Sequence, residues 1–574
     1  MLVWLSLDTW LISLLSIAYL MLLFVVAYWG QKQTNNKWLK HPWVYSLSLG
    51  VSCTSWAFYG TVGQAATTGA WLAPVYIGSI LCFVLAWPML LRILRISKQQ
   101  NLTSIADFIA CRYDRSPLIA ATVTLVALLG TIPYIALQLR AISTSFDLVT
   151  GSYQSGISTT FVVTIVLIIF SILFGARQVV INKQNQGLVL AIAFSSVVKL
   201  FALTAVGIFA TFFVFDGVSD LLIQTENIKP SAPSSNGTYF AISQAILGMI
   251  TIFILPQQYH IIMIENHHEK ELKTARWLYP LYLILINLFV LPIALAGQSL
   301  FPGGSVNADT YVITIPLFFQ QAWLGGLVFI GGLAAATSMV IIATVVLSTM
   351  VTTEIINPLL LRHKSFMVQQ KNQLSGLLLN LRRIAIALLL LLAFIFERAI
   401  AEQNHLAGIG LLSFVLLAQL APLVIGALYW RNATSKAALT GLVVGSIIWL
   451  YTLLLPSLFP QSTWLTTGLF GFSWLKPYAL FGVTFLDDIS HGLLFSLLAN
   501  TCCFIGISFF GRRSVGEKLQ AELFINKQQK NLEHELSHKD LYQLLQRFVN
   551  NEAANTFKQY YPETRKHSAA NDKL

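Results

Sequence analysis

Charged residues are scarce in this chain of 574 residues, because Asp, Glu, Lys and Arg together make up 10% of it and hydrophobic residues make up 56%. Soluble domains carry roughly 25% charged residues, so the composition excludes a soluble globular protein. Cysteine is also scarce, with five residues, and the sequence contains no CxxC pair, so we expect neither a disulfide framework nor a cysteine metal site. It also contains no P-loop and no recognisable nucleophile or metal-ligand motif. We therefore expect that the chain is not an enzyme and has no bound organic cofactor.

What the chain has instead is a succession of long hydrophobic runs. A membrane-spanning helix needs about 20 predominantly apolar residues, and about thirteen runs approach that length. They lie at residues 5–29, 42–64, 71–94, 117–147, 160–176, 186–214, 240–264, 277–299, 322–350, 383–402, 406–429, 437–455 and 488–510. The sequence therefore predicts an all-α integral membrane domain over residues 1–510. A polar, helix-prone tail follows over residues 511–574.

The formal net charge of +12 is explained by the loops between these runs. Lys and Arg are concentrated in one set of alternate loops, whereas the opposite loops contain only Lys229 and Lys476. Cytoplasmic loops of membrane proteins accumulate Lys and Arg. The pattern therefore predicts the N-terminus outside the cell and the C-terminus in the cytoplasm. It makes the lipid bilayer, and not a nucleic acid, the expected surroundings of this basic chain.

Two of the predicted spans contain residues that interrupt helices. The second is rich in Ser, Thr and Gly, and the seventh contains Pro256 within an otherwise apolar run. Proline removes a helical hydrogen bond, and an unwound backbone at membrane depth is tolerated where it lines a cavity. Such interrupted helices hold the solute in many transporters. The alternative is that small residues allow close helix packing and that the proline only kinks its helix.

The polar and aromatic side chains of these two spans, with one from the fourth, are our candidate solute contacts. They are Ser52, Thr54, Trp56, Tyr59, Gln138, Gln257 and His260. Each has a structural alternative. Aromatic residues in membrane helices also serve packing or interface anchoring, and interior amides and histidines also form hydrogen bonds between helices.

Three groups of motifs resemble those of the sodium:solute symporter family over about residues 1–510. They are Thr103-Ser104-Ile105-Ala106-Asp107-Phe108 with Arg112-Tyr113, Leu333-Ala334-Ala335 with Ser338, and Ala421-Pro422 with Gly426-Ala427-Leu428-Tyr429-Trp430-Arg431. The resemblance implies a LeuT-like core, a five-plus-five inverted repeat formed by spans two to eleven. It also implies symport of a small organic solute, such as the amino acids proline or histidine, by alternating access. The implied location is the bacterial cytoplasmic (inner) membrane.

Other motifs resemble the symporter-like input domain of bacterial sensor histidine kinases. They are Cys53-Thr54-Ser55-Trp56, Gly187-Leu188-Val189-Leu190 and Ala275-Arg276-Trp277-Leu278-Tyr279-Pro280. The tail, from Glu517 to Phe548, resembles the short helical module that joins such domains to the kinase. This resemblance implies an alternative function, a transmembrane sensory input module with a histidine kinase partner in cis or in trans. His534-Glu535 resembles a phospho-acceptor box, but no Gly-rich ATP-binding segment follows it, so we do not expect kinase activity in this chain.

The family resemblance further implies a cation site between spans two and nine. Carried over residue by residue, this site falls on carbonyls of Gly50, Cys53 and Ala335, the hydroxyl of Ser338 and the side chain of Met339. The family usually has a second hydroxyl at the last position, and a thioether is a poor ligand for hard Na⁺. The coupling ion is therefore left open between Na⁺ and H⁺.

Lys199 lies near the centre of the sixth span, where a charge is costly and normally faces the interior of the bundle. One hypothesis is that its ammonium fills part of the electrostatic role of sodium, or that it titrates as a coupling proton changes place. The alternative is a structural lysine that caps backbone carbonyls.

Overall fold

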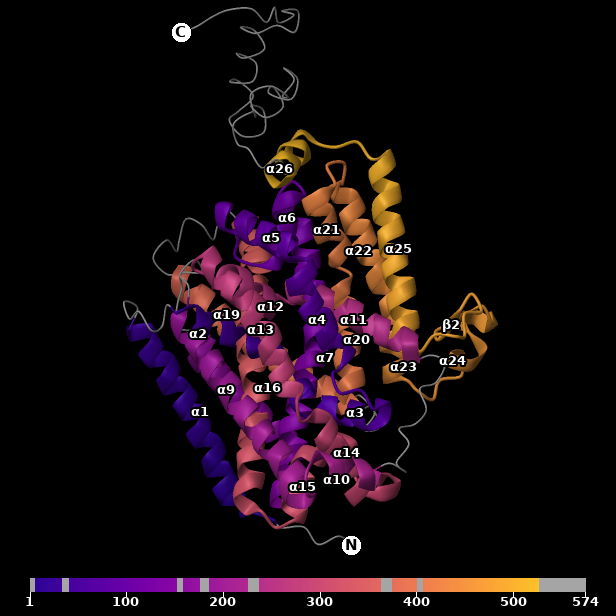
Figure 1. Cartoon of the computed structure of the whole chain (residues 1–574). Helices are drawn as coiled ribbons and strands as arrows, with labels where there is room; N and C mark the ends of the chain where they lie inside the picture. The colour runs from indigo at the N-terminus through magenta and orange to yellow at the C-terminus, as the bar shows by residue number, and fades with distance from the viewer. Residues whose placement is uncertain are drawn as a thin grey trace, which may run out of the picture.

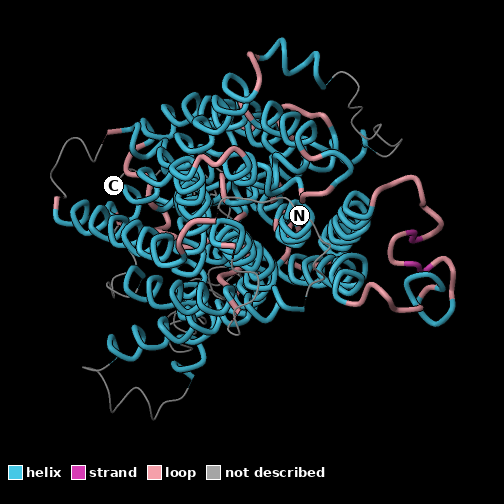
Figure 2. The backbone as a smooth tube through the Cα atoms, turned by 90° about the horizontal axis from the view of Figure 1, so that it is seen from below, coloured by secondary structure: helices cyan, strands magenta, loops and turns pink. Residues whose placement is uncertain are grey.

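The computed structural model describes residues 6–33, 41–151, 158–175, 185–225, 237–362, 374–399 and 406–525. These residues form a bundle of helices, with α1 along one side and α25 along the opposite side (Figure 1). A single two-stranded antiparallel sheet, β1 (Leu475–Lys476) and β2 (Ala479–Leu480), occurs in a loop beside the bundle (Figure 2). Residues 526–574 of the predicted tail, which include His534 and Glu535, lie outside the described residues.

Ten helical segments of the described residues are long and apolar enough to cross a membrane, and each coincides with a predicted span. Several are continued by a π turn or a second helix. The ten segments are α1 (Thr9–Lys32), α7 (Pro117–Thr150), α9 (Gln186–Phe209) with η3 (Ala210–Val214), α11 (Gly237–Ile254), α13 (Glu269–Asn287) with α14 (Val290–Leu300), α16 (Ala322–Met350) with η7 (Val351–Ile356) and α17 (Asn357–Arg362), α19 (Leu374–Ala399), α20 (Leu406–Ala418) with α21 (Ala421–Tyr429), α22 (Ser435–Trp449) with η8 (Leu450–Leu454) and α23 (Leu455–Leu458), and α25 (Asp488–Phe510).

The other three predicted spans have irregular forms. The span predicted at 71–94 is the pair α4 (Pro74–Leu85) and α5 (Trp87–Gln99), bent by 73°. Pro88 lies just after the bend, and proline both lacks an N–H and clashes with the preceding turn. The span predicted at 160–176 is α8 (Thr159–Gly175), a helix of 17 residues. The span predicted at 42–64 is broken into four pieces, which are described below with the site.

Short elements lie between the spans, and one, α26, follows the last span. They are α6 (Ile105–Arg112), α10 (Val218–Thr225), η5 (Pro302–Gly304), η6 (Ala308–Thr310), α15 (Tyr311–Phe318), α24 (Trp464–Thr467), η9 (Leu469–Gly471) and α26 (Val515–Ile525). Of these, α6 and α26 lie at the end of the bundle opposite to that at which the chain begins (Figure 1).

The outer surface of α1 is strongly apolar. Trp10, Ile17, Met21 and Val25 are each more than half exposed on it. A soluble protein rarely presents so continuous an apolar face to water, whereas a bilayer accepts it. The described residues thus form a multi-span membrane protein.

Two of the motifs that carry the family resemblance meet in space. Arg112, at the end of α6, donates hydrogen bonds to the carbonyl oxygens of Trp430 and Arg431 at 2.9 and 3.3 Å. The hydroxyl of Tyr113 donates to the carbonyl oxygen of Leu423 at 2.9 Å. These bonds fasten α6 to α21, at the same end of the bundle as α26.

Candidate functional site

The second span is interrupted near its middle. It begins as α2 (Pro42–Ser48), narrows to the 3-10 turn η1 (Leu49–Ser52), and resumes as the π turn η2 (Trp56–Gly60) and α3 (Thr61–Thr68). Cys53, at the end of η1, has φ −83° and ψ 84°, outside the helical region. The regular i→i−4 ladder therefore stops here, and backbone groups on both sides of the break need other partners.

The seventh span is interrupted in a similar way at its proline. Helix α11 ends at Ile254, Leu255 has ψ 124°, and the chain resumes as α12 (Pro256–Tyr259) and the π turn η4 (His260–Ile264). Pro256 cannot donate a backbone hydrogen bond, which is tolerated at the first position of a helix. The prediction that spans two and seven are broken is thus confirmed by the backbone.

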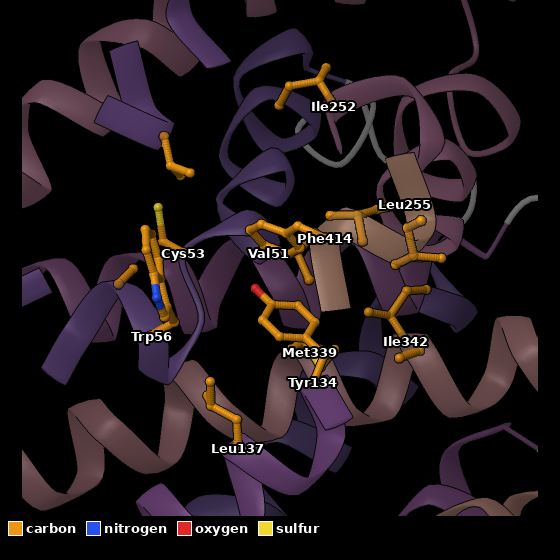
Figure 3. Close-up of a cluster of buried hydrophobic side chains, with 14 of the residues drawn as sticks. Val51, Cys53, Trp56, Tyr134, Leu137, Ile252, Leu255, Met339, Ile342 and Phe414 are labelled. Atoms are coloured by element: carbon orange, nitrogen blue, oxygen red, sulfur yellow. The ribbon is translucent and has the colours of Figure 1, made fainter. Parts of the chain in front are cut away.

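The two broken segments lie against each other around a small central cavity. The hydroxyl of Tyr45 in α2 donates to the carbonyl oxygen of Ile262 in η4 at 2.9 Å. The cavity has a volume of about 20 Å³, which is room for about one water molecule. Its lining residues are Val51, Ser52, Trp56, Val75, Tyr76, Ser79, Tyr134, Thr251, Ile252, Leu255, Gln257, Gln258 and Phe414. Figure 3 shows several of them gathered between the helices.

Several polar side chains at this cavity have atoms without a hydrogen-bond partner among the described residues. They are the indole Nε1 of Trp56, the hydroxyl of Tyr76, Oε1 of Gln257, and both Nε2 and Oε1 of Gln258. All four residues are at most 2% exposed. A buried polar atom without a partner costs about 1–3 kcal/mol, so such a group of them calls for a specific explanation. Donors and acceptors at one cavity suit a polar solute.

A second, larger cavity lies toward the end of the bundle at which the chain begins. It has a volume of about 550 Å³ and is lined by residues of α3, α20 and the start of α25, among them Gln64, Leu412 and Asp488. Trp56 and Phe414, which line the central cavity from the same two spans, contact each other with ring centroids 6.5 Å apart. The same two spans also line the large cavity, with Gln64 eight residues after Trp56 and Leu412 two residues before Phe414.

The structure brings three of the seven predicted solute contacts to the central cavity: Ser52, Trp56 and Gln257. Thr54 lies next to it, with its hydroxyl 3.1 Å from that of Tyr134. Gln138 is directed at the first break, where its Oε1 accepts hydrogen bonds from the backbone N–H and the hydroxyl of Ser55 at 3.1 and 2.6 Å.

The other two predicted contacts lie away from the cavity lining. Tyr59 is directed toward α16, where a Cβ added at Gly332 would collide with its ring. His260 contacts Glu265, with Nε2 3.1 Å from Oε1, near the end of η4.

The predicted cation site contains an ammonium group. Lys199 of α9 is fully buried, and its Nζ donates hydrogen bonds to the carbonyl oxygens of Gly50 at 2.5 Å and Cys53 at 2.6 Å. These are the two carbonyls of the second span that the family resemblance assigns to the cation. These contacts are compatible with both interpretations of Lys199, a substitute for the cation and a structural lysine that caps backbone carbonyls.

The remaining positions of the predicted cation site lie on α16. Ala335, Ser338 and Met339 are all buried, and the Ser338 hydroxyl donates to the carbonyl oxygen of Ala335 on its own helix at 3.2 Å. Met339 is drawn in the central cluster of Figure 3. The side chains that α16 contributes are thus a hydroxyl engaged with its own backbone and a thioether.

Sequence reasoning missed ten of the thirteen cavity residues, among them the aromatic or amide residues Tyr76, Tyr134, Gln258 and Phe414. Two of them had a usable signal, because Gln258 adjoins Gln257 and Tyr134 lies one helical turn before Gln138. Tyr76 and Phe414 lie on spans that carry no interruption at these positions, and nothing in the sequence distinguishes them from packing aromatics.

Comparisons with known proteins find similar symporters. No protein-family model matches the chain. The uncharacterized symporter YhjB of Bacillus subtilis (strain 168) is 23% identical over 415 residues, which are 70% of this chain and 78% of the relative. The uncharacterized symporter YodF of the same organism is 23% identical over 407 residues, which are 68% of this chain and 75% of the relative.

A solved structure is similar as well. It shows a Na⁺-coupled sialic acid symporter in a substrate-bound, outward-open state, and it matches with a TM-score of 0.63 at 14% identity. The match covers 88% of this chain and 98% of that one. The comparison confirms the predicted fold class, an all-α membrane protein with a LeuT-like core. These similar proteins are symporters and not enzymes, as expected for the chain from its sequence.

Proposed function

We propose that the chain is a secondary active symporter that moves a small organic solute across the membrane by alternating access. The observation that carries the proposal is the convergence of Trp56, Tyr76, Gln257 and Gln258 at the central cavity, each with a buried polar atom without a partner among the described residues. A solute that hydrogen-bonds to these atoms would remove their desolvation cost. The two curated relatives are named as symporters, which supports the same function.

The proposed solute is an amino acid such as proline or histidine. The residues that line the cavity are aromatic, aliphatic or uncharged polar, which suits a solute without a net charge. Trp56, Tyr76, Tyr134 and Phe414 supply aromatic faces on which a small ring would pack. The amides of Gln257 and Gln258 supply donors and acceptors for the polar ends of a zwitterion.

The proposed transport cycle uses the two cavities in turn. With the N-terminus outside the cell, the large cavity near Gln64 and Asp488 faces the external medium. Solute would pass Trp56 and Phe414 from there and bind between the breaks. Because the central cavity holds only about 20 Å³, the described state is closed around this site, and binding requires the flanking segments to separate.

Uptake by purified protein in proteoliposomes tests the proposal. A panel of radiolabelled amino acids is offered under an imposed Na⁺ gradient or an imposed H⁺ gradient, with protein-free liposomes as background. The matched variants are Gln257→Leu at the cavity and Ile447→Leu on the exposed face of α22. We expect uptake by the wild type and Ile447→Leu and a strong loss in Gln257→Leu. If no panel member is taken up and none binds, the proposal is wrong.

A second candidate function is that of a sensory input module, and the contacts of α26 favour it. This helix is fastened to the bundle by Glu517, which accepts a hydrogen bond from the N–H of Ser435 at 2.7 Å, and by Arg92, which donates to the carbonyl oxygen of Phe524 at 2.9 Å. The ring of Phe524 packs on that of Phe108, with their centroids 5.3 Å apart. The ring of Phe108 packs in turn on that of Tyr259 of the seventh span, with centroids 6.1 Å apart. A movement of the seventh break would therefore reach α26 through two ring contacts.

Hydrogen exchange of α26 separates the two candidates. Solute binding without uptake, together with faster exchange over residues 515–525 when solute is added, would favour a module that reports solute to a histidine kinase, in cis or in trans. Uptake with unchanged exchange would favour autonomous transport. Phe524→Ala is the matched variant, because it removes the ring contact and leaves the backbone bonds of α26 in place.

A further inference from the structure

The ammonium of Lys199 is held without a carboxylate partner among the described residues. The side chain is fully buried in the middle of α9, yet among the described residues its hydrogen-bond acceptors are two backbone carbonyls and no carboxylate forms an ion pair with it. Charged groups inside membranes normally pair with one another or with backbone carbonyls, at sites of function. Among the described residues, the positive charge of Lys199 is therefore stabilised by backbone dipoles and not by an ion pair.

The two carbonyls lie at the break, where that of Gly50 also accepts the backbone N–H of Cys53 at 2.9 Å and has a second lone pair for Lys199. Gly50 and Cys53 belong to η1 and its end, where the helix has stopped repeating. Backbone carbonyls at broken helix ends are the groups with which transporters of this architecture coordinate cations. Nζ lies 2.5 and 2.6 Å from these oxygens, within hydrogen-bonding distance, and the charge on the donor strengthens such bonds.

The close approach of η1 to α9 makes this geometry possible. A Cβ added at Gly50 would lie 2.6 Å from the hydroxyl oxygen of Ser196 and 3.0 Å from the ring of Tyr282. Only a residue without a side chain therefore allows η1 to pack so tightly on the helix that carries Lys199. Tyr282 also donates from its hydroxyl to the carbonyl oxygen of Ser196 at 2.9 Å, which fixes the same region of α9.

The remaining positions do not form a set of oxygen ligands. The Ser338 hydroxyl donates to its own helix at 3.2 Å, and Met339 contributes a thioether. Na⁺ is a hard cation that prefers oxygen ligands. A free ion placed at this point would also meet the positive charge of Lys199.

We infer that the Lys199 ammonium is the resident cation of this site and that the chain binds no Na⁺ between the second and ninth spans. A lysine is part of the chain and cannot leave toward the cytoplasm as an ion does. The Na⁺ gradient therefore does no work through this site. The consequence for coupling rests on the proposed transport function, whereas the occupancy of the site by Lys199 does not.

Thermal unfolding of the purified full chain, in Na⁺ or in choline at equal ionic strength, tests the inference without any solute. We expect the same midpoint in both media for the wild type. In the double variant Lys199→Ala with Met339→Ser, the tethered charge is gone and a second hydroxyl is present. We expect Na⁺ to raise the midpoint of that variant by several degrees, and Ser338→Ala added to it to abolish the rise.

Lys199→Met is the matched control, because it removes the charge but keeps a long side chain in the site. We expect its midpoint to be insensitive to Na⁺. Two results would overturn the inference. One is a folded double variant that gains no stabilisation from Na⁺. The other, which needs no change at Lys199, is Na⁺ stabilisation of the wild type that Ser338→Ala removes.

Failure of the transport proposal would look different. In that case no amino acid is taken up or bound, while the Na⁺ response of the double variant still differs from that of the wild type.

Discussion

The two interrupted spans solve the same structural problem in opposite ways. At the second span, Gly50 and Cys53 direct carbonyl oxygens at the Lys199 ammonium, and the break is satisfied from within the chain. At the seventh span, Gln257 and Gln258 follow Pro256 with polar atoms that have no partner among the described residues. One break is already occupied by a charge, and the other leaves donors and acceptors for a solute.

Sodium symport combines two tasks, the binding of a cation and the binding of a solute, and the two breaks of this chain differ in which of them they serve. In such a symporter, a cation and a solute both arrive from solution and bind together. Here the positive charge at the second break is built into α9, so we infer that no Na⁺ has to arrive at this break and that the coupling ion is H⁺ or a cation bound elsewhere. The predictions below ask whether the two breaks differ as described, in order from the largest expected effect to the smallest.

The largest effect is expected for Gly50→Ala. Its new Cβ would lie 2.6 Å from the Ser196 hydroxyl oxygen and 3.0 Å from both the Ser196 Cβ and the Tyr282 ring, so the crowding would push η1 and its carbonyls away from α9 and Lys199. Overpacking of this kind costs about 1–3 kcal/mol of stability. We expect a lower thermal midpoint and loss of solute uptake in proteoliposomes.

Gly326→Ala on α16 is the control for Gly50→Ala, because a Cβ at that glycine meets nothing within 4 Å. We expect it to unfold at or above the wild-type temperature and to transport normally. Wild-type uptake by Gly50→Ala would show that the tight packing of the second break is not needed.

A matched pair of glutamines distinguishes the break in the second span, where Gln138 is hydrogen-bonded, from the break in the seventh span, where Gln257 has an atom without a partner among the described residues. Gln138 accepts two hydrogen bonds from Ser55, whereas Oε1 of Gln257 accepts none from the described residues. We expect Gln257→Leu to weaken solute binding by about tenfold or more, since a lost hydrogen bond of about 1.4 kcal/mol has that effect. Its thermal midpoint should stay close to that of the wild type, because no internal bond is lost.

Gln138→Leu should behave in the opposite way. It leaves the N–H of Ser55 buried without a partner, at a cost of about 1–3 kcal/mol, so we expect a clearly lower midpoint. Thermal unfolding and solute titration of both variants check the pair. Equal loss of stability in the two variants would remove the distinction between the breaks.

The smallest effect is expected for His260→Gln. His260 contacts Glu265 at 3.1 Å near the end of η4 and does not line the central cavity. Glutamine keeps a polar group within reach of that carboxylate, so we expect solute affinity to change less than about threefold, or about 0.7 kcal/mol. A tenfold loss in a solute titration would move the solute site toward the end of the seventh span.

The sequence predicts the spans well because a bilayer imposes a length and a composition that a single chain reveals. It also indicates both broken spans, since Ser, Thr, Gly and Pro at membrane depth are signals in themselves. The 73° bend between α4 and α5 was not predicted, although Pro88 lies beside it, because a proline does not say how far a helix turns.

The candidate site was less accessible to sequence reasoning. Ser52, Trp56 and Gln257 reach the cavity because they lie on the broken segments, but Tyr76 and Phe414 lie within the regular helices α4 and α20, away from the interruptions of their spans. The contact of Lys199 with Gly50 depends on the relative height of α9 and η1. Hydrophobic periodicity gives the face of a helix and not its height against a neighbour, so only the structure could join these residues.

The most direct test of the account is the flux of Na⁺ that accompanies solute. Proteoliposomes containing the wild type are loaded without Na⁺, and uptake of ²²Na⁺ is measured with and without the transported amino acid, at equal pH on both sides. With Lys199 as the resident cation, we predict that the amino acid enters while ²²Na⁺ uptake stays at the level without it. Amino-acid-dependent ²²Na⁺ uptake that Ser338→Ala abolishes would contradict the account.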